Sequence, residues 1–237
     1  MSMTKEAMEY VVELGNAETK EIGTQTFSTQ RLNLVQEPTA SEIVLRSLSG
    51  LVEYVKSEFD KLEPLMIHVE NPTKVSLFTT MNGNFNRSVL IRAEASIPHF
   101  RFSNFHDREE FNINLQSGFV PNSDREIVLK VVGTIAETSV REIGDDGVSQ
   151  AVTAKVSVGN RENVKVPNPV ELRPYRTFVE VEQPESQFIF RMKEGAYCGL
   201  FEADGGAWKL EAMTKVKDYL KVALEEEIAA KKVFIIA

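Results

Sequence analysis

Residues 164–208 are dense in strand-forming side chains and are interrupted at intervals by proline and glycine. Val, Thr, Tyr and Phe favour strands, whereas Pro and Gly mark turns. This spacing leaves room only for short strands with tight connections, and such strands pair antiparallel. The stretch holds the single cysteine, Cys198, and the single tryptophan, Trp208, but no histidine. It therefore predicts a scaffold and not a reaction centre.

Two further turn signals lie inside alternating segments. Asn82-Gly83 interrupts an alternating stretch over residues 65–96, and Asp146-Gly147 interrupts another over residues 139–159. Asn-Gly and Asp-Gly readily adopt the positive φ angles that two-residue hairpin turns require. The first stretch therefore predicts a strand meander and the second predicts a β-hairpin.

Apolar residues recur at three- and four-residue steps in several segments, and this spacing predicts helices. A short amphipathic helix and an extended arm make residues 1–36 a candidate for use in assembly. A broad apolar stripe predicts a helix over residues 38–62. A helical hairpin is expected near 107–136, with Asp107 as the N-cap of its first helix. A long C-terminal helix is expected over 207–232.

These elements add up to an α+β protein with mostly antiparallel sheets and about five helices. No segment repeats at a fixed period, and no Gly/Ser-rich linker divides the chain. We therefore expect a single α+β domain over residues 1–237, whose length permits a large buried core.

Composition limits the kinds of partner and compartment. The chain of 237 residues has a net charge of −8, which repels nucleic acid at long range without excluding a local basic patch. A single cysteine excludes an internal disulfide framework and indicates a reducing compartment. No apolar run is long enough to span a membrane, and the N-terminus lacks the pattern of a signal peptide. We expect a cytoplasmic protein with no membrane partner.

The chain offers little that is typical of catalysis. It has three histidines, of which His99 and His106 flank aromatic residues near Asp107 and Glu110 and could in principle hold a metal. Their spacing does not place them on one helix face, so we favour loop histidines beside aromatic packing. Cys198 is expected to pack as a small apolar residue. Phosphate-binding loops and hydrolase motifs are missing from the sequence. We predict no catalytic residue, no cofactor and no metal, and hence no enzyme.

Arginines that alternate with aromatic residues suggest a different activity. Proteins that bind single-stranded nucleic acid combine cationic grooves with stacking rings. The alternative is that the phenylalanines are core residues and the arginines are balanced surface charges. The candidate nucleic-acid contacts are Arg87, Arg101, Arg173 and Arg176.

The apolar segment at 233–236 favours a protein partner. A run of exposed apolar residues in water promotes aggregation, so we expect this segment to pair as an edge strand, within the fold or across a subunit boundary. A homo-oligomer is therefore predicted. The candidate oligomer contacts are Val233, Phe234, Ile235 and Ile236.

The second half of the chain resembles a known group of proteins. The order of elements and the phrases VREIGDDGVSQAVTAKVSVG, VPNPVELRPYRTF, QPESQFIFRM and LFEADGGAWKLEA carry the likeness, which covers about residues 105–212. They resemble an uncharacterised bacteriophage and prophage family defined by a domain of unknown function. The resemblance implies a phage gene product in a bacterial host. It brings no activity and no site residues.

Several functions remain open on these observations. The leading hypothesis is a non-enzymatic phage-type protein that acts by self-association and by binding a macromolecule. A second is a single-stranded nucleic-acid-binding accessory protein in phage replication or recombination. A third is an inhibitor of a host defence system that acts on a host protein or on a signalling nucleotide. A fourth is a capsid-like shell component.

Overall fold

The computed structural model describes residues 5–15, 18–29, 34–35, 38–62, 64–134, 143–145, 150–156, 162–193 and 195–237. These residues form six helices and sixteen strands, arranged in two five-stranded and two three-stranded sheets. Most strand pairs are antiparallel, so the predicted α+β class is confirmed. None of the helices in the described part of the chain combines the length and apolar character that a membrane crossing requires.

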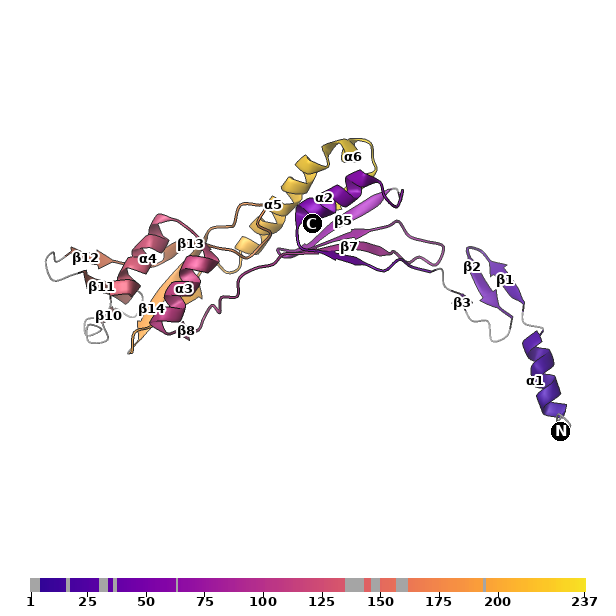
Figure 1. Ribbon diagram of the computed structural model, residues 1–237, viewed down its shortest axis with the longest axis horizontal. Coiled ribbons are helices and arrows are strands. Elements are labelled where there is room, and N and C mark those ends of the chain that lie inside the picture. The colour runs from indigo at the N-terminus through magenta and orange to yellow at the C-terminus, as the bar shows by residue number, and fades with distance from the viewer. Residues whose placement is uncertain are drawn as a thin grey trace.

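The first body is a five-stranded sheet of order β16-β5-β6-β7-β4 with helices on one face (Figure 1). Its elements are β4 (Ile43–Leu45), α2 (Leu48–Ser57), β5 (Leu65–Asn71), β6 (Lys74–Phe78), β7 (Val89–Glu94), α5 (Trp208–Ala223), α6 (Glu225–Ala229) and β16 (Val233–Ile236). Buried leucines and valines of α2 and α5 pack on the inward residues of β5, β6 and β7. The two outer strands, β4 and β16, pair in parallel with β7 and β5.

The second body is inserted in the chain between β7 and α5. Its sheet has the order β8-β15-β14-β13-β9, and α3 and α4 pack on it around a separate apolar cluster. The elements are β8 (Phe105–His106), α3 (Arg108–Gly118), β9 (Phe119–Val120), α4 (Ser123–Thr134), β13 (Val170–Pro174), β14 (Ser186–Lys193) and β15 (Tyr197–Glu202). A three-stranded sheet of β10 (Ile143–Asp145), β11 (Gln150–Val156) and β12 (Glu162–Lys165) lies beside α4.

The N-terminal arm stands at the far end of the first body (Figure 1). It consists of α1 (Lys5–Gly15) and a small sheet of β1 (Thr19–Ile22), β2 (Gln25–Ser28) and β3 (Leu34–Val35). The hydroxyl of Thr24, in the β1–β2 turn, donates a hydrogen bond of 2.9 Å to the carbonyl of Gly83 in the β6–β7 loop. This contact joins the arm to the main sheet.

A strap of residues 175–185, which follows β13, connects the two bodies. Its Phe178 and Val181 are buried in the apolar cluster of the first body, not in that of the second. The hydroxyl of Thr177 donates to the carbonyl of Pro72 at 2.5 Å. A carboxylate oxygen of Glu180 accepts from the backbone N–H of Leu48 at 2.8 Å, so the strap supplies an acceptor to the N-terminus of α2.

The predicted helix over 38–62 is only partly correct. Residues 43–45 form the strand β4, and α2 begins at Leu48 after Ser47, whose hydroxyl accepts from the N–H of Gly50 at 3.1 Å. The three apolar residues of β4 fit the pattern of either element, because a short apolar run does not distinguish a strand from a helix. The strand that pairs with β4, β7, lies far along the chain. The helix ends where Glu58 adopts a left-handed conformation.

Other predicted elements agree more closely. The helical hairpin near 107–136 is confirmed as α3 and α4, and Asp107 caps α3 by accepting from the N–H of Glu110 at 2.9 Å. The expected C-terminal helix is shorter than predicted and is divided at Leu224 into α5 and α6. The predicted turn at Asp146-Gly147 lies outside the described residues.

Candidate functional site

The C-terminal segment forms β16 on the edge of the first sheet. It pairs in parallel with β5, with Val233 opposite Leu65 and Ile236 opposite His68. Side chains alternate along a strand, so Val233 is 1% exposed whereas Phe234 and Ile236 are 52% and 45% exposed. The sequence left open whether this segment pairs within the fold or across a subunit boundary, and in the structure it pairs within the fold. This pairing leaves the outer edge and one face of β16 uncovered.

Phe234 and Ile236 belong to the open face, which we define as the sheet surface opposite α2 and α5. In register with Phe234 lie Met66 and Phe78, so the β16 end of this face begins with an apolar row. The row that starts at Ile236 continues through His68 and becomes polar on the inner strands. The open face is therefore apolar at one corner.

The opposite edge of the same sheet is different in character. Beside β4, Glu42 pairs with Arg92 at 2.6 Å, and Arg46 pairs with Glu94 at 3.2 Å. Charged residues beside an edge strand oppose pairing with another chain. Neither β4 nor β16 contains a charged residue, and Lys231 and Lys232 come directly before β16. The two edges differ in their ladder partners: those of β16, residues 65–68, include no Asp, Glu, Lys or Arg, whereas Arg92 is a ladder partner of β4.

A cavity of about 240 Å³ lies at the apolar corner of the open face, and we call it the β16 cavity. Its walls come from the start of β5, from the loop that joins β6 to β7, and from β16 itself. The lining includes Pro64, Met66, Thr79, Met81, Arg87 and Phe234. Arg87, one of the four candidate nucleic-acid contacts, is exposed and is the only charged residue of this lining.

The four candidate arginines do not gather on one surface. Arg87 lies on the first body, whereas Arg101 is exposed before β8 of the second body, with its Nε 3.3 Å from Nε2 of His99. Arg173 and Arg176 lie in β13 and the strap. Their role as nucleic-acid contacts stays a prediction.

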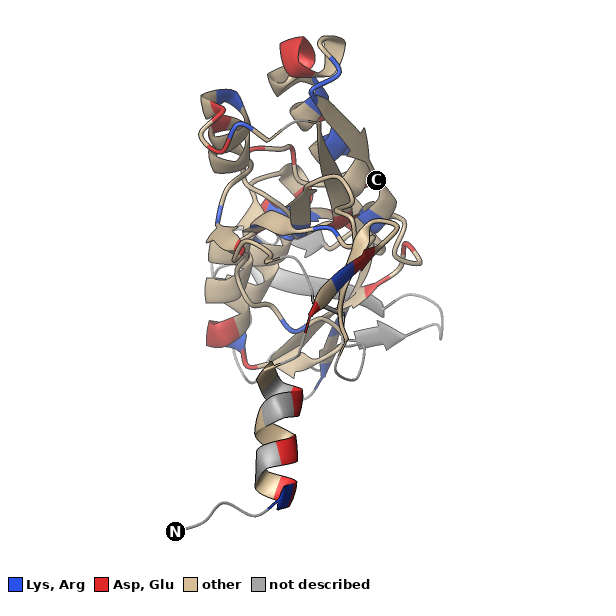
Figure 2. Cartoon of the chain, turned by 90° about the vertical axis from the view of Figure 1, so that its right-hand side faces the viewer, with Lys and Arg blue, Asp and Glu red and all other residues tan. Residues whose placement is uncertain are grey.

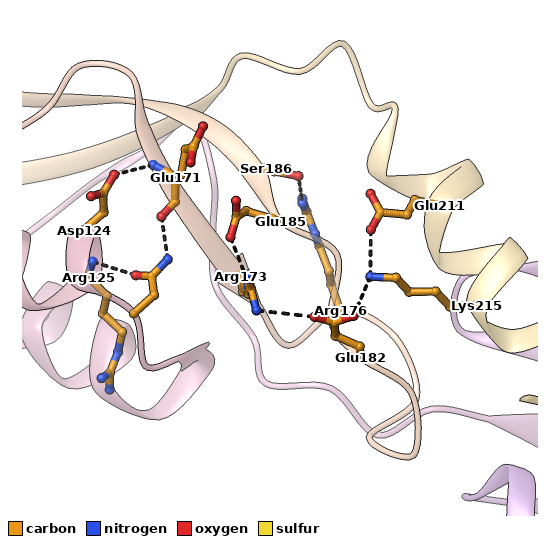
Figure 3. A network of polar contacts seen from close by, with 11 residues as sticks. Asp124, Arg125, Glu171, Arg173, Arg176, Glu182, Glu185, Ser186, Glu211 and Lys215 are labelled. Atoms are coloured by element: carbon orange, nitrogen blue, oxygen red, sulfur yellow. Dashed lines mark hydrogen bonds and ion pairs between the residues drawn. The ribbon is translucent and has the colours of Figure 1, made fainter.

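Arg173 is part of an ion-pair chain between the two bodies (Figure 3). Its guanidinium lies 2.7 Å from Glu185 and 3.4 Å from Glu182. Glu182 in turn lies 3.4 Å from Lys215 of α5. The same lysine pairs with Glu211 at 2.7 Å. These contacts fasten β13 and the strap to α5.

Arg176 is buried at 4% exposure. Its guanidinium stacks on Trp208, 3.9 Å from the ring centre, and pairs with Glu202 at 2.9 Å. It also donates to the hydroxyl of Ser186, which donates to Asp204 at 2.7 Å. Sequence reasoning placed Arg176 beside nearby aromatic residues and missed Trp208. The only available signal was the acidic and aromatic cluster at 201–208.

The charges of this cluster are coupled. Burial lowers the pKa of the Arg176 guanidinium to about 10, although Glu202 and Asp204 act to raise it. Burial alone would raise the pKa of Asp204. Hydrogen bonds from Ser186 and the N–H of Gly206, together with the charge of Arg176, outweigh that effect and lower the pKa. Both groups are therefore ionised at neutral pH, as an internal ion cluster requires.

The residues with possible catalytic chemistry are held in structural roles. Cys198 is fully buried in β15, and burial raises the pKa of its thiol to about 12, which disfavours the nucleophilic thiolate. His106 is buried, with Nε2 3.0 Å from the carbonyl of Arg101 and Nδ1 3.2 Å from Glu110. Among the described residues, no three His, Cys, Asp or Glu side chains are arranged to hold a metal ion.

No protein-family model matches this chain, and neither the curated proteins nor the solved structures include a significant match. The resemblance of residues 105–212 to phage proteins therefore stays a prediction.

Proposed function

We propose that this protein acts by self-association, with β16 of one copy pairing antiparallel with β16 of a second copy about a two-fold axis. The observation that carries the proposal is an uncharged edge strand whose Phe234 and Ile236 stay about half exposed. An uncovered edge presents N–H and C=O groups that a second strand can pair with.

Two-fold symmetry suits this strand because both copies contribute the same surface. Pairing β16 with its copy joins two five-stranded sheets into one continuous sheet. The exposed side chains Phe234 and Ile236 would then lie next to their symmetry mates on the open face, and burial of such apolar area supplies the main free energy of association. The edge at β4, which carries ion pairs, is the weaker candidate for the same role.

We place this activity in the cytoplasm of a bacterial host. The resemblance of residues 105–212 to phage and prophage proteins supports that setting. A single cysteine that is buried suits a reducing compartment.

Ile236→Lys tests the proposed pairing. A charged side chain on an edge strand opposes pairing with another chain, so we expect a wild-type dimer to become a monomer, measured by multi-angle light scattering after gel filtration. Val222→Lys is the matched control, because Val222 is an exposed apolar residue of α5, away from the sheet edge. The control is expected to remain dimeric, and both variants are expected to keep the wild-type circular dichroism spectrum.

A wild-type protein that is strictly monomeric up to about 100 μM would overturn the proposal, because that range detects association as weak as about 5.5 kcal/mol. A dimer that Ile236→Lys and Val222→Lys leave equally intact would show that another surface is used.

A further inference from the structure

The second sheet has α3 and α4 against one face (Figure 1), and we call the opposite face the outer face. Phe190, Cys198 and Leu200 belong to the apolar cluster on the helix side. Side chains alternate along a strand and ladder partners share a face, so the residues between these belong to the outer face. The outer-face residues considered below are all at least partly exposed, and they are Phe105, Arg191, Lys193, Tyr197 and Phe201.

Two phenylalanine rings lie next to each other on the outer face, close to the backbone of Gly199. The ring centres of Phe105 in β8 and Phe201 in β15 are 5.6 Å apart. A Cβ added at Gly199 would lie 3.2 Å from the Phe201 ring and 3.3 Å from the Phe105 ring, so the glycine lets both rings approach the strand. Both rings are half-buried, and Tyr197 on the same strand is 42% exposed. The outer face therefore presents three aromatic rings to solvent.

Cationic side chains accompany these rings. The Nζ atom of Lys193 lies 4.4 Å from the ring centre of Phe105 and 5.3 Å from that of Tyr197. Arg191 lies on the same face of β14, two residues before Lys193. The outward positions of β8, β14 and β15 hold no Asp or Glu. The aromatic end of the outer face is thus positively charged.

Acidic residues lie elsewhere in the described part of the chain. Glu171 of β13 also belongs to the outer face, but its ladder partner is Gln187, roughly 20 Å along β14 from Lys193. Figure 2 shows the acidic residues of α1 along one side, and α1 belongs to the arm at the far end of the first body. The first turn of α6, also in the first body, holds three glutamates. Charges more than about 8 Å apart are largely screened at physiological salt, so the cations of the outer face act locally despite the net charge of −8.

Rings and cations on one face fit a ligand that has flat apolar groups and a negatively charged backbone. Single-stranded nucleic acid has this chemistry, because its bases stack on aromatic side chains while its phosphates pair with Lys and Arg. Antiparallel sheets with exposed aromatic residues stack two or three bases in this way. The long, flexible side chain of Lys193 can exchange its ring contact for a phosphate.

We infer that the outer face of the second sheet binds single-stranded nucleic acid, with bases stacked on Phe105 and Phe201 and phosphates beside Arg191 and Lys193. This inference goes beyond the proposed self-association, which uses the first sheet. It also places the nucleic-acid contacts on residues other than the four arginines considered above.

Fluorescence anisotropy of the full-length protein with labelled oligo-dT and oligo-U tests the inference. Oligonucleotides of about 12 nucleotides lie within the site sizes that such proteins cover. We expect a Kd below about 100 μM, the weak end of non-specific binding. Tighter binding of either oligonucleotide identifies DNA or RNA as the preferred strand, since the 2′-hydroxyl distinguishes them. A DNA duplex of the same length should compete at least about tenfold more weakly, because its bases are not free to stack.

Phe201→Ala tests the stacking contact. Loss of one stacked base is expected to raise the Kd about tenfold, equal to about 1.4 kcal/mol. Phe201→Tyr keeps the ring and is expected to keep the wild-type Kd, which separates lost stacking from a damaged fold. Phe59→Ala is the matched control, because Phe59 is 81% exposed and follows α2 in the first body. We expect this control also to bind like wild type.

The salt dependence of binding tests the cationic contact separately. Lys193→Gln is expected to make the slope of log Kd against log salt less steep by about 0.7, the value for one phosphate contact with a single strand. Phe201→Ala should leave this slope unchanged, because stacking releases no counterion. Lys221→Gln is the control, since Lys221 is an exposed lysine of α5.

Three results would overturn the inference. The first is no binding of either oligonucleotide at low salt, which would leave the outer face to a protein partner. The second is a duplex that competes as well as the single strand. The third is an equal Kd for Phe201→Ala and Phe59→Ala. A protein that binds as a monomer would instead refute only the proposed self-association, so the two failures are distinct.

Discussion

At the scale of single residues, the most constrained side chain is Arg176. A buried guanidinium is costly unless its charge is compensated and its donors are used. Here Glu202 supplies the opposite charge, Ser186 accepts a hydrogen bond, and the ring of Trp208 lies against the cation. These partners come from β14, β15 and the start of α5. A single arginine thus holds together elements that are distant in the sequence.

Replacing Arg176 should therefore destabilise the fold. We expect Arg176→Ala to lower the free energy of unfolding by about 3 kcal/mol, near the low end for a broken buried pair because Glu202 remains partly hydrated. Urea denaturation followed by tryptophan fluorescence measures this, since Trp208 is the only tryptophan.

Arg173→Ala serves as the comparison for Arg176. Arg173 is paired at the surface, where an ion pair contributes about 1 kcal/mol or less. Equal losses in the two variants would contradict the role assigned to the buried stack.

At the scale of elements, the sequence correctly predicted the features that depend on residues close together in the chain. Asp107 begins a helix because its carboxylate can accept from the N–H of Glu110, which lies only three positions further along the sequence. The strand at 43–45 could not be separated from the helix that follows, because its ladder partner is Ile91 and its neighbours. The pattern of apolar and polar residues in a segment does not indicate which distant strand will pair with it.

The candidate site was predictable to a similar degree. Apolar residues 233–236 indicate an edge strand, and the structure has them at an edge beside Leu65. The β16 cavity was not predictable, because its lining comes from three segments that are separate in the sequence. Arg176 was singled out for a basic and aromatic pattern, yet its ring partner lies more than thirty residues away in the sequence.

The N-terminus of α2 is completed by a residue from another part of the chain. Glu180 accepts hydrogen bonds from the N–H groups of Leu48 and Ser49 at 2.8 and 3.3 Å, and its charge favours the positive end of the helix. We expect Glu180→Ala to cost about 1–2 kcal/mol of unfolding free energy, and Glu180→Gln to cost less because an acceptor oxygen is kept.

Thermal unfolding of the Glu180 variants checks this order. Glu182→Ala is the comparison, because Glu182 lies on the same strap but only forms exposed ion pairs. A Glu180→Ala protein as stable as Glu182→Ala would mean that solvent replaces the cap without loss.

At the scale of the whole molecule, the buried apolar residues form two separate clusters. One is built around α2, α5 and the first sheet, and the other is built around α3, α4 and the second sheet. Phe178 of the strap crosses into the first cluster, so the bodies are joined by packing as well as by chain connections. The prediction of a single domain stays a prediction.

The arm contributes to neither cluster as far as the structure describes them, because their earliest member is Leu45. Deleting residues 1–37 should therefore shift Tm by less than about 2–4 °C, the change that 1 kcal/mol produces in a chain of this size. Differential scanning calorimetry measures the shift. A larger loss would show that the arm stabilises the main body.

The parallel pairing of β16 with β5 has a consequence for biosynthesis. During translation β5 is synthesised early, whereas its partner strand β16 is synthesised only after the entire inserted body. Contacts between such remote segments form slowly, because closing a long loop loses much chain entropy. Until β16 is made, the edge of the nascent sheet along Leu65–Asn71 stays unpaired and its apolar residues stay exposed. This unpaired edge is where a chaperone would be needed most.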